Sequence, residues 1–276
     1  MHSFVDIEGV RTLMPSYDTF IFDLWGTIYD GNSIFPEFLL VLSELRRCNK
    51  TVKFLSNSPR RSIVSKERLA KCGLDLEVND IITSGEYFSH LLSTSEYGLQ
   101  KFFLIGNDST VLEGFNIRVS DNLADADYLL ITLSDQTQDM GVWKDIMIEA
   151  VQRGIRAVCI NPDLEVFHGQ TKFYTPGYYA MRYEKLGGDV IYFGKPYKGV
   201  YDFILSKNGS LKSMLAVGDA VGTDIKGAHD QRIDSLLVLG NGIHKNIQKK
   251  DKIQILSLCQ QYKCYPKYIM NKLTLD

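Results

Sequence analysis

Acidic side chains stand directly after apolar, strand-like segments at two places in this sequence. Asp23 follows the residues Thr19–Phe22, and Asp219 follows SMLAVG with Asp224 five positions later. A carboxylate placed in this way can act as a nucleophile that accepts a phosphoryl group, and it can also bind a metal ion. The alternative for each residue taken singly is an aspartate that caps a turn or, for Asp224, the first turn of a helix.

Two other residues at the ends of apolar segments complete a coherent set. Ser56 ends the segment KFLS, and Lys195 follows YFG. A serine hydroxyl and the amides around it can hold phosphate oxygens, and a lysine ammonium offsets the repulsion between a carboxylate and a phosphate. Asp23 and Asp219 together can hold Mg²⁺, which prefers oxygen ligands. Singly, the serine is read as a turn residue and the lysine as a surface residue, but their order along the chain favours the joint interpretation.

The elements that must position these residues alternate between strand and helix. Strand-like segments are separated by apolar residues at helical spacing, which predicts a doubly wound α/β fold with a parallel sheet. Because the carboxyl ends of parallel strands lie at one edge, we expect residues that are distant in the sequence to converge there. Residues 1–18 are expected to be irregular. The predicted strands are 19–22, 51–57 and 80–85, and the predicted helices are 35–49 and 59–71, the latter with Ser58 as its N-cap.

The pattern restarts after Gly85 and predicts a second, smaller α/β unit inserted into the first. Its expected strands are 101–106, 126–132 and 156–163, with helices at 86–92 and 142–153. Segment 189–196 is expected to return the chain to the first sheet, which strands at 213–220 and 234–242 and a helix at 253–262 then complete. We therefore expect a core domain formed by 1–85 and 188–276, and an inserted cap domain at 86–187.

The composition is that of an ordinary globular protein and gives no sign of a nucleic-acid or membrane partner. The chain has 276 residues, a formal net charge of −2 and 45% hydrophobic residues, so no basic surplus points to nucleic acid or to an anionic membrane. No apolar run approaches the roughly 18 residues of a membrane span. The N-terminal residues carry two acids and no secretory pattern, which predicts a cytoplasmic location. The five scattered cysteines are interpreted as reduced thiols.

The motifs resemble those of a known superfamily. DLWGT, the SN of FLSNSPR, the GKP at 194–196 and GDAVGTDIKGA are similar to the four motifs of the haloacid dehalogenase-like superfamily. CINPD, the PG at 176–177 and YEKLGGDVIYFGKP resemble its class IIA, NagD-like branch, which includes nucleotide-, sugar- and pyridoxal-phosphate phosphatases. The resemblance implies a Rossmann-like core, a type-two cap at about 86–187 and a phosphorylated small-molecule substrate.

The resemblance also implies roles for individual residues. Asp23 would be the nucleophile that forms an aspartyl phosphate, Ser56 and Asn57 the phosphate binders, and Lys195 the group that stabilises charge. The Mg²⁺ ligands would be Asp23, Asp219, Asp224 and the backbone carbonyl of Trp25.

Trp25 departs from the pattern of the family. Phosphatases of this family carry a second aspartate two residues after the nucleophile, where it acts as general acid and base. An indole N–H donates a hydrogen bond but does not ionise usefully, and general acid–base catalysis contributes roughly 10²–10⁴-fold to a rate, or about 3–5 kcal/mol. We therefore expect slow turnover of alkyl phosphates and less effect on acyl or aryl phosphates. Asp30 is a candidate replacement, with a hairpin-turn residue as the alternative.

Two other functions remain open from the sequence. A phosphate-ligand binding protein without efficient turnover would need only the serine, the lysine and the metal. A dehalogenase also lacks the second aspartate but needs no metal, so the acids of GDAVGTD disfavour it.

The expected cap carries two further groups of interest. Asn161 and Asp163 are candidate substrate-binding residues, or else a turn after a strand. Tyr174, Tyr178, Tyr179 and Tyr183 are an aromatic cluster for ring stacking, internal packing or a partner interface. A homo-oligomer formed through the cap is the expected assembly.

Overall fold

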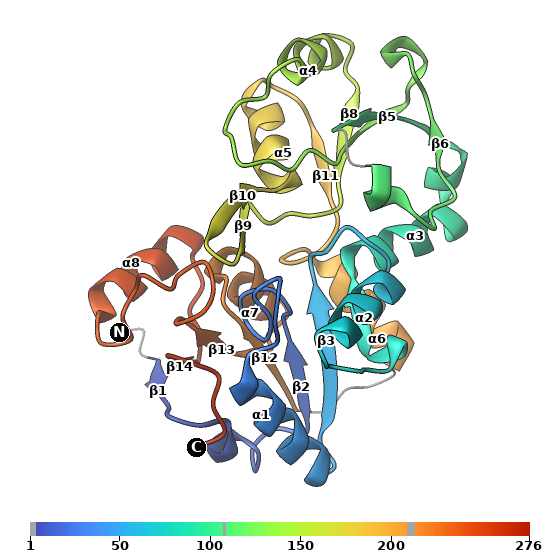
Figure 1. The fold of residues 1–276 in the computed structure, drawn as a ribbon. Helices are drawn as coiled ribbons and strands as arrows, with labels where there is room; N and C mark the ends of the chain where they lie inside the picture. Colours follow the sequence, from blue (N-terminus) through green and yellow to red (C-terminus); the bar gives the residue numbers. More distant parts are fainter. Residues whose placement is uncertain (1–3, 107–108, 209–212) are drawn as a thin grey trace.

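The computed structural model describes residues 4–106, 109–208 and 213–276. Its larger lobe, called the core lobe here, is built around a parallel sheet (Figure 1). Within the described residues this sheet has seven strands in the order β1-β14-β13-β12-β2-β3-β4, and all neighbouring pairs are parallel. The strands are β1 (Val5–Asp6), β2 (Thr19–Phe22), β3 (Thr51–Ser56), β4 (Ile81–Thr83), β12 (Met214–Gly218), β13 (Asp234–Val238) and β14 (Tyr268–Met270).

Helices cover both faces of this sheet because its strands are apolar on both sides. In β2, Phe20 and Phe22 pack with α1 and α2, while Ile21 points to the opposite face and packs with α6 and α7. Alternate residues of a strand face opposite sides, so a strand buried between two helical layers must be apolar throughout. The helices of the core lobe are α1 (Pro36–Arg47), α2 (Ser62–Lys71), α6 (Lys198–Asn208), α7 (Lys226–Asp230) and α8 (Lys252–Tyr262).

A second parallel sheet forms the centre of the smaller lobe, called the cap lobe here, which lies above the core lobe in Figure 1. In the described part of the chain its five strands follow the order β11-β8-β7-β5-β6. Helix α3 covers one face, while α4 and α5 cover the other. The elements are β5 (Lys101–Ile105), β6 (Arg118–Val119), β7 (Tyr128–Ile131), β8 (Arg156–Cys159), β11 (Val190–Tyr192), α3 (Ser84–Thr94), α4 (Trp143–Gln152) and α5 (Pro176–Lys185).

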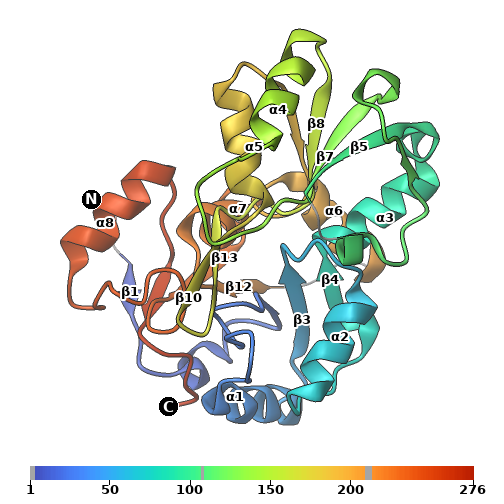
Figure 2. The ribbon, with the colours of Figure 1, turned by 45° about the horizontal axis from the view of Figure 1, so that its top comes forward.

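An antiparallel hairpin links the two lobes and was not expected from the sequence. Strands β9 (Glu165–His168) and β10 (Thr171–Tyr174) form it, and it extends from the cap lobe toward the core lobe in both ribbon views (Figures 1 and 2). The N–H of Gly169 at its tip donates a hydrogen bond of 3.2 Å to the carbonyl of Asp30 in the core lobe.

The α/β fold is confirmed, and three of the expectations about its elements are wrong. Segment 189–196 does not return to the first sheet, because β11 pairs with β8 and completes the cap sheet. The N-terminal lead-in is not wholly irregular, since β1 pairs with β14 at the sheet edge. Helix α2 begins at Ser62 rather than at Pro59, and the carboxylate of Glu86, not Ser58, accepts the N–H of Ser62 at 3.2 Å. The domain boundaries, as limits of folding units, stay a prediction.

The aromatic residues of the cap lobe pack inside it. Tyr179 and Tyr183 are fully buried in its core, and Tyr174 and Tyr178 pack against them. Internal packing therefore accounts for this cluster. None of the helices in the described ranges is both long and apolar enough to cross a membrane.

Candidate active site

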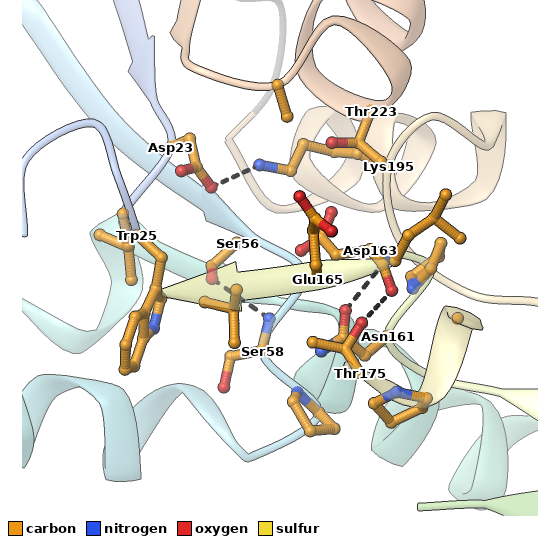
Figure 3. Close-up of a pocket in the computed structure, with 18 of the residues that line it drawn as sticks. Asp23, Trp25, Ser56, Ser58, Asn161, Asp163, Glu165, Thr175, Lys195 and Thr223 are labelled. Carbon is orange, nitrogen blue, oxygen red and sulfur yellow. Dashed lines mark hydrogen bonds and ion pairs between the residues drawn. The ribbon is translucent and has the colours of Figure 1, made fainter. Parts of the chain in front are cut away.

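The ammonium of Lys195 is the centre of a buried ionic cluster at the carboxyl edge of the core sheet (Figure 3). Its Nζ donates hydrogen bonds to Asp23 Oδ1 at 2.6 Å, to Asp224 Oδ1 at 2.6 Å and to the carbonyl of Leu55 at 2.8 Å. The three donors of the ammonium are thus all used. Lys195 is 4% exposed, and its two carboxylate partners are buried as well.

Asp219 completes a cluster of three carboxylates. Oxygens of Asp23, Asp219 and Asp224 lie within 4.8 Å of one another. The N–H of Ile243 donates to Asp219 Oδ2 at 2.7 Å, and the hydroxyl of Thr27 lies 3.4 Å from an oxygen of both Asp23 and Asp219. One ammonium and a few hydrogen-bond donors therefore face three buried carboxylates. A further cation bound at this site would reduce the repulsion between them.

Burial and mutual repulsion shift the pKa values of Asp23 and Asp219. Burial raises the pKa of Asp219 well above its usual range, and the nearby charges of Asp23 and Asp224 raise it further. Burial also raises the pKa of Asp23; Lys195 opposes that rise and Asp224 adds to it. For Lys195, burial alone would lower the pKa, but Asp224 and Asp23 outweigh it and raise the value. The lysine is thus a cation at neutral pH, whereas the acids carry more negative charge than this environment readily holds.

The local fold explains the position of each acid. Asp23 directly follows β2, and its N–H donates to the carbonyl of Val217 at 2.8 Å, which continues the strand pairing by one residue. Asp219 directly follows β12. Asp224 lies in a π-helical turn at Val221–Ile225, and its Oδ2 accepts the N–H of Ala220 at 3.0 Å. It therefore stabilises the turn that presents its other oxygen to Lys195.

Lys195 reaches the site by a different route from the one expected. It follows β11 of the cap sheet, so it does not lie at the end of a core strand. The side chain of Asn57 binds it instead: Asn57 Oδ1 accepts the N–H of Lys195 at 2.7 Å, and Nδ2 donates to its carbonyl at 3.0 Å. Asn57 Nδ2 also donates to Asp163 Oδ1 at 2.9 Å. Both amide donors of Asn57 thus hold other parts of the site, and its expected phosphate contact stays a prediction.

The expected cap residues do face the site. Asn161 and Asp163 line the same pocket as Asp23 and Ser56, and Figure 3 shows them beside Thr175 and opposite Lys195. The close approach of Gly177 positions this loop, because a Cβ at Gly177 would lie 2.4 Å from the carbonyl oxygens of Pro162 and Asp163. Burial raises the pKa of Asp163, although Lys195 opposes the shift. Whether these residues contact substrate stays a prediction.

Ser56 and Trp25 line the pocket on the core side. Ser56 is buried, and its Oγ accepts the N–H of Ser58 at 3.2 Å, which leaves its hydroxyl proton for a ligand. The indole of Trp25 stands away from Asp23 in Figure 3 and packs edge-to-face on Tyr29 and His168, with ring centroids at 5.0 and 4.6 Å.

Asp30 does not fill the place of the missing acid. Its Oδ1 accepts the N–H groups of Asn32 and Ser33, both at 2.8 Å. These hydrogen bonds outweigh the effect of burial and lower the pKa of Asp30. The hairpin-turn interpretation of Asp30 is therefore the one that the structure supports.

The pocket above the cluster measures about 970 Å³ and is lined by both lobes. Sequence reasoning missed several residues that line it or hold its acids. Thr27 carried a signal, since it lies four residues after Asp23 in the same motif. Arg68, His168 and His244 carried none, because their positions depend on how the helix, the hairpin and a loop pack together.

Comparison with known proteins identifies the family of this chain. Residues 20–116 match the family model described as "Haloacid dehalogenase-like hydrolase", and residues 192–274 match a second one described as HAD-hydrolase-like. Together these segments cover more than half of the chain.

Two curated relatives are phosphatases. The chain is 26% identical to the sugar-phosphatase AraL of Bacillus subtilis over 162 residues, which are 55% of this chain and 58% of that protein. It is 25% identical to phosphoglycolate phosphatase 2 of Arabidopsis thaliana over 271 residues, covering 84% of this chain and 86% of that protein. The chain thus spans under two thirds of the first relative and most of the second.

Solved structures share the fold over almost the entire chain. A haloacid dehalogenase-like hydrolase from Brucella suis superposes with a TM-score of 0.81 at 24% identity, covering 97% of this chain and 100% of that chain. A putative nagD protein superposes with a TM-score of 0.65 at 26% identity, covering 81% and 89% of the two chains. The second match supports the predicted resemblance to the class IIA branch. With its two family matches and its shared fold, this chain belongs to the haloacid dehalogenase-like hydrolases.

Proposed function

We propose that this protein is a Mg²⁺-dependent phosphomonoester hydrolase in which Asp23 is the nucleophile. The observation that carries the proposal is the buried cluster of Lys195 with Asp23 and Asp224 at 2.6 Å, beside Asp219, in a large pocket between the lobes. Phosphoryl transfer needs positive charge around the transferred group and an ionised nucleophile, and this cluster supplies the parts for both.

The donor set fits a hard divalent cation. Asp23, Asp219 and Asp224 offer carboxylate oxygens within 4.8 Å of one another, and oxygen ligands suit Mg²⁺ and Ca²⁺. We infer that these residues, with the backbone carbonyl of Trp25, hold Mg²⁺. Once bound, the ion would neutralise charge on the carboxylates and on the phosphate. The positive charge of the ion would also lower the pKa of the Asp23 carboxyl, because it favours the ionised form.

The residues of the chain account for the other requirements of the reaction. An oxygen of Asp23 attacks phosphorus and forms an aspartyl phosphate while the ester P–O bond breaks, and the leaving group departs as an alkoxide or aryloxide that takes its proton from water. Lys195 stabilises the charge that develops on the phosphoryl oxygens, and the Ser56 hydroxyl donates a hydrogen bond to one of them. Asn57 holds Lys195 in position through two hydrogen bonds to its backbone. Water then cleaves the aspartyl phosphate and releases phosphate.

Trp25 limits the rate of hydrolysis in the proposed reaction. The leaving alcohol needs a proton, and neither the indole nor the turn-bound Asp30 supplies one. Esters with acidic leaving groups, such as aryl phosphates, should therefore turn over faster than alkyl phosphates by roughly 10²–10⁴-fold. Because water attack on the aspartyl phosphate also needs a base, a phosphoenzyme should accumulate when the donor is activated.

A screen of phosphate esters with and without Mg²⁺ tests the proposal, with Asp23→Asn as the matched control. We expect release of phosphate from aryl and acyl phosphates that depends on Mg²⁺ and is abolished in the control. Acid quenching after mixing with a ³²P-labelled donor should leave label on the wild type and none on the control. Equal turnover by both proteins would overturn the assignment of Asp23.

The second candidate is a phosphate-ligand binding protein, and the observation that favours it is the aromatic packing of Trp25 where the acid would stand. Trp25→Asp separates the two functions. A gain of 10²-fold or more on alkyl phosphates would indicate a site that lacks only its acid. Unchanged turnover with retained phosphate binding would favour the binder.

The expectations about reaction class, cellular location, partners and oligomeric state also belong with this proposal. The carboxylate cluster supports metal-dependent chemistry over a dehalogenase. The cytoplasmic location, the absence of nucleic-acid and membrane partners, and a homo-oligomer formed through the cap stay predictions.

A further inference from the structure

The pocket offers far more space than a phosphate ion needs. It measures about 970 Å³, which is the upper end of the range for pockets that enclose whole small molecules. In the proposed reaction the phosphoryl group would occupy only the part of the pocket at Asp23 and Lys195. The remaining walls therefore contact the organic part of the substrate and decide which ester binds.

One wall of the pocket carries a cation from α2. Val64, Ser65, Arg68 and Leu69 line the pocket and share one face of this helix, since residues three and four positions apart lie together. The guanidinium carbon of Arg68 lies 5.8 Å from the ring centroid of Trp25. A cation–π contact of this kind attracts the guanidinium to the ring without using its N–H donors.

Arg68 has no anionic partner among the described residues. In the described part of the chain it lies over the Trp25 ring, and it is close enough to Tyr29 and His168 to act on them electrostatically. By contrast, Arg61, the residue directly before this helix, is held by Glu86 at 2.7 Å. An arginine is charged at every accessible pH and has five N–H donors, so a half-buried arginine that lines a pocket can bind an anion there. The hydroxyl of Ser65, one turn earlier, makes no hydrogen bond within the described ranges either.

The acids elsewhere in the pocket are already engaged. Glu165 forms an ion pair with Lys172, and Glu184 accepts the hydroxyl of Tyr192 at 2.9 Å. Away from Lys195, the arginines that line the pocket are Arg60, which donates to the hydroxyl of Thr110 at 2.9 Å, and Arg68, which marks the cationic end beside Trp25. His168, on the hairpin from the cap lobe, closes over the same Trp25 ring, so the hairpin encloses this end.

We propose that Arg68, with Ser65 beside it, binds a second anionic group of the substrate, so that the preferred phosphomonoesters carry a carboxylate or a second phosphoryl group. The inference rests on the proposed function for the site of the first phosphate. The fork of the guanidinium matches both anions. Trp25 thus has a positive role: its ring orients the arginine that selects the substrate.

A matched pair of substrates tests the carboxylate. 3-Phosphoglycerate and glycerol 3-phosphate differ by a carboxylate in place of a hydroxymethyl group, and a fructose bisphosphate with its monophosphates tests the second phosphoryl group. We expect kcat/KM to be roughly 10–100-fold higher for the ester with the second anion, the factor expected for a hydrogen-bonded charge pair. The set of substrates that shows the preference identifies whether the second anionic group is a carboxylate or a phosphoryl group.

Three variants of arginine show whether Arg68 causes the preference. Arg68→Gln should remove the preference by raising KM for the ester with the second anionic group roughly 10–100-fold more than KM for glycerol 3-phosphate. Arg68→Lys should restore part of the preference, because it keeps the charge and loses the fork. Arg46→Gln, on the exposed face of α1, is the matched control and should change nothing.

A binding arm separates this inference from the proposed function. Titration calorimetry with Asp23→Asn, alone and combined with Arg68→Gln, measures the same preference without turnover. An Arg68-dependent preference in binding supports the inference even where no ester is hydrolysed, which would overturn only the proposed function. Equal affinity for both esters, or an equal loss for both in Arg68→Gln without rescue by lysine, overturns the inference.

Discussion

At the scale of single residues, the ammonium of Lys195 stabilises a group of charges that would otherwise repel one another. It binds Asp23 and Asp224 at 2.6 Å each, and it is buried with them. Breaking such a buried pair by removing one partner leaves uncompensated charge and costs about 3–5 kcal/mol. The same charge also faces the phosphoryl group in the proposed reaction.

Lys195→Met should therefore lower both stability and activity. We expect the free energy of unfolding to fall by about 3–5 kcal/mol in urea titrations, and kcat to fall by about 10²–10³-fold, as when one preorganised donor is removed. Lys198→Met is the control, because the Lys198–Asp202 pair is largely exposed and such pairs contribute at most about 1 kcal/mol. Equal effects of the two substitutions would contradict the role given to the buried ammonium.

At the scale of elements, the β9–β10 hairpin connects the two lobes over the pocket. His168 packs on Trp25, Phe167 lies under the ammonium of Lys245 at 4.2 Å, and the N–H of Gly169 binds the carbonyl of Asp30. These contacts come from two loops of the core lobe. They hold the hairpin against the pocket entrance, and each is weak enough to break and reform.

His168→Ala should loosen the hairpin without unfolding the protein. An aromatic contact contributes about 0.5–1.5 kcal/mol, so local opening should become roughly 2–10-fold more frequent. Hydrogen exchange of the amides at 165–174 measures this opening. His229→Ala, in an exposed position on α7, should leave those rates unchanged. Unaltered exchange in His168→Ala would show that the ring contact does not hold the hairpin.

The junction between α2 and α3 depends on one carboxylate. Glu86 accepts hydrogen bonds from the guanidinium of Arg61 at 2.7 Å and from the N–H of Ser62, the first residue of α2, at 3.2 Å. Burial raises the pKa of Glu86, but these hydrogen bonds outweigh that effect and lower it below its usual 4.5. Because α2 carries Arg68, this junction also positions the proposed anion site.

Because the pKa of Glu86 is lowered in the folded protein, its contribution to the free energy of unfolding depends on pH. The stability from ionised Glu86 is present above pH 4.5 and is lost as the pH falls through the lower, folded-state value. Glu86→Gln should thus cost about 1 kcal/mol at pH 7, after allowing for partial exposure, and progressively less below pH 4.5. Urea unfolding between pH 3 and 7 measures the difference. Asp75→Asn, at an exposed pair, is the comparison, and a difference independent of pH would argue against the ion pair.

At the scale of the whole molecule, the proposed metal site at the three buried carboxylates would link stability to a bound ion. A ligand that binds only the folded state stabilises it by about 2.7 kcal/mol at one hundred times its Kd. The cluster of Asp23, Asp219 and Asp224 exists only when β2, β12 and the π-helical turn are assembled. A cation bound there should consequently stabilise the entire core lobe.

Mg²⁺ should raise the thermal midpoint by several degrees, and EDTA should reverse the rise. Asp219→Asn should abolish the response to Mg²⁺. It should also leave the metal-free protein at least as stable as wild type, because one of three repelling buried charges is gone. Differential scanning calorimetry measures both effects, with Asp202→Asn as an exposed control. A full response to Mg²⁺ in Asp219→Asn would exclude this cluster as the metal site.

Local sequence patterns were sufficient for the strands that lead to the site. Segments such as Thr19–Phe22 are apolar throughout, which is the requirement for a strand covered by helices on both faces. The acids after β2 and β12 were therefore placed correctly at one edge. The short edge strand β1, its neighbour β14 and the hairpin were missed, because two to four residues show too little periodicity to be distinguished from loops.

The case of Lys195 shows where pattern reasoning stops. Its convergence with Asp23 was expected because both follow apolar segments, but the segment before Lys195 belongs to the other sheet. An apolar strand does not encode which sheet it joins, since that choice depends on partners distant in the sequence. The convergence arises from the side chain of Asn57 instead.

The sequence alone determined the fold class, the order of the chemically active residues and the absence of an ionisable group at Trp25, because these depend on residue type and local periodicity. Only the tertiary structure decided that Trp25 packs between Arg68 and His168, and that Arg68 faces the pocket without an anionic partner. Such contacts join a helix, a loop and a hairpin from three parts of the chain. Packing of separate elements, rather than any local pattern, creates them.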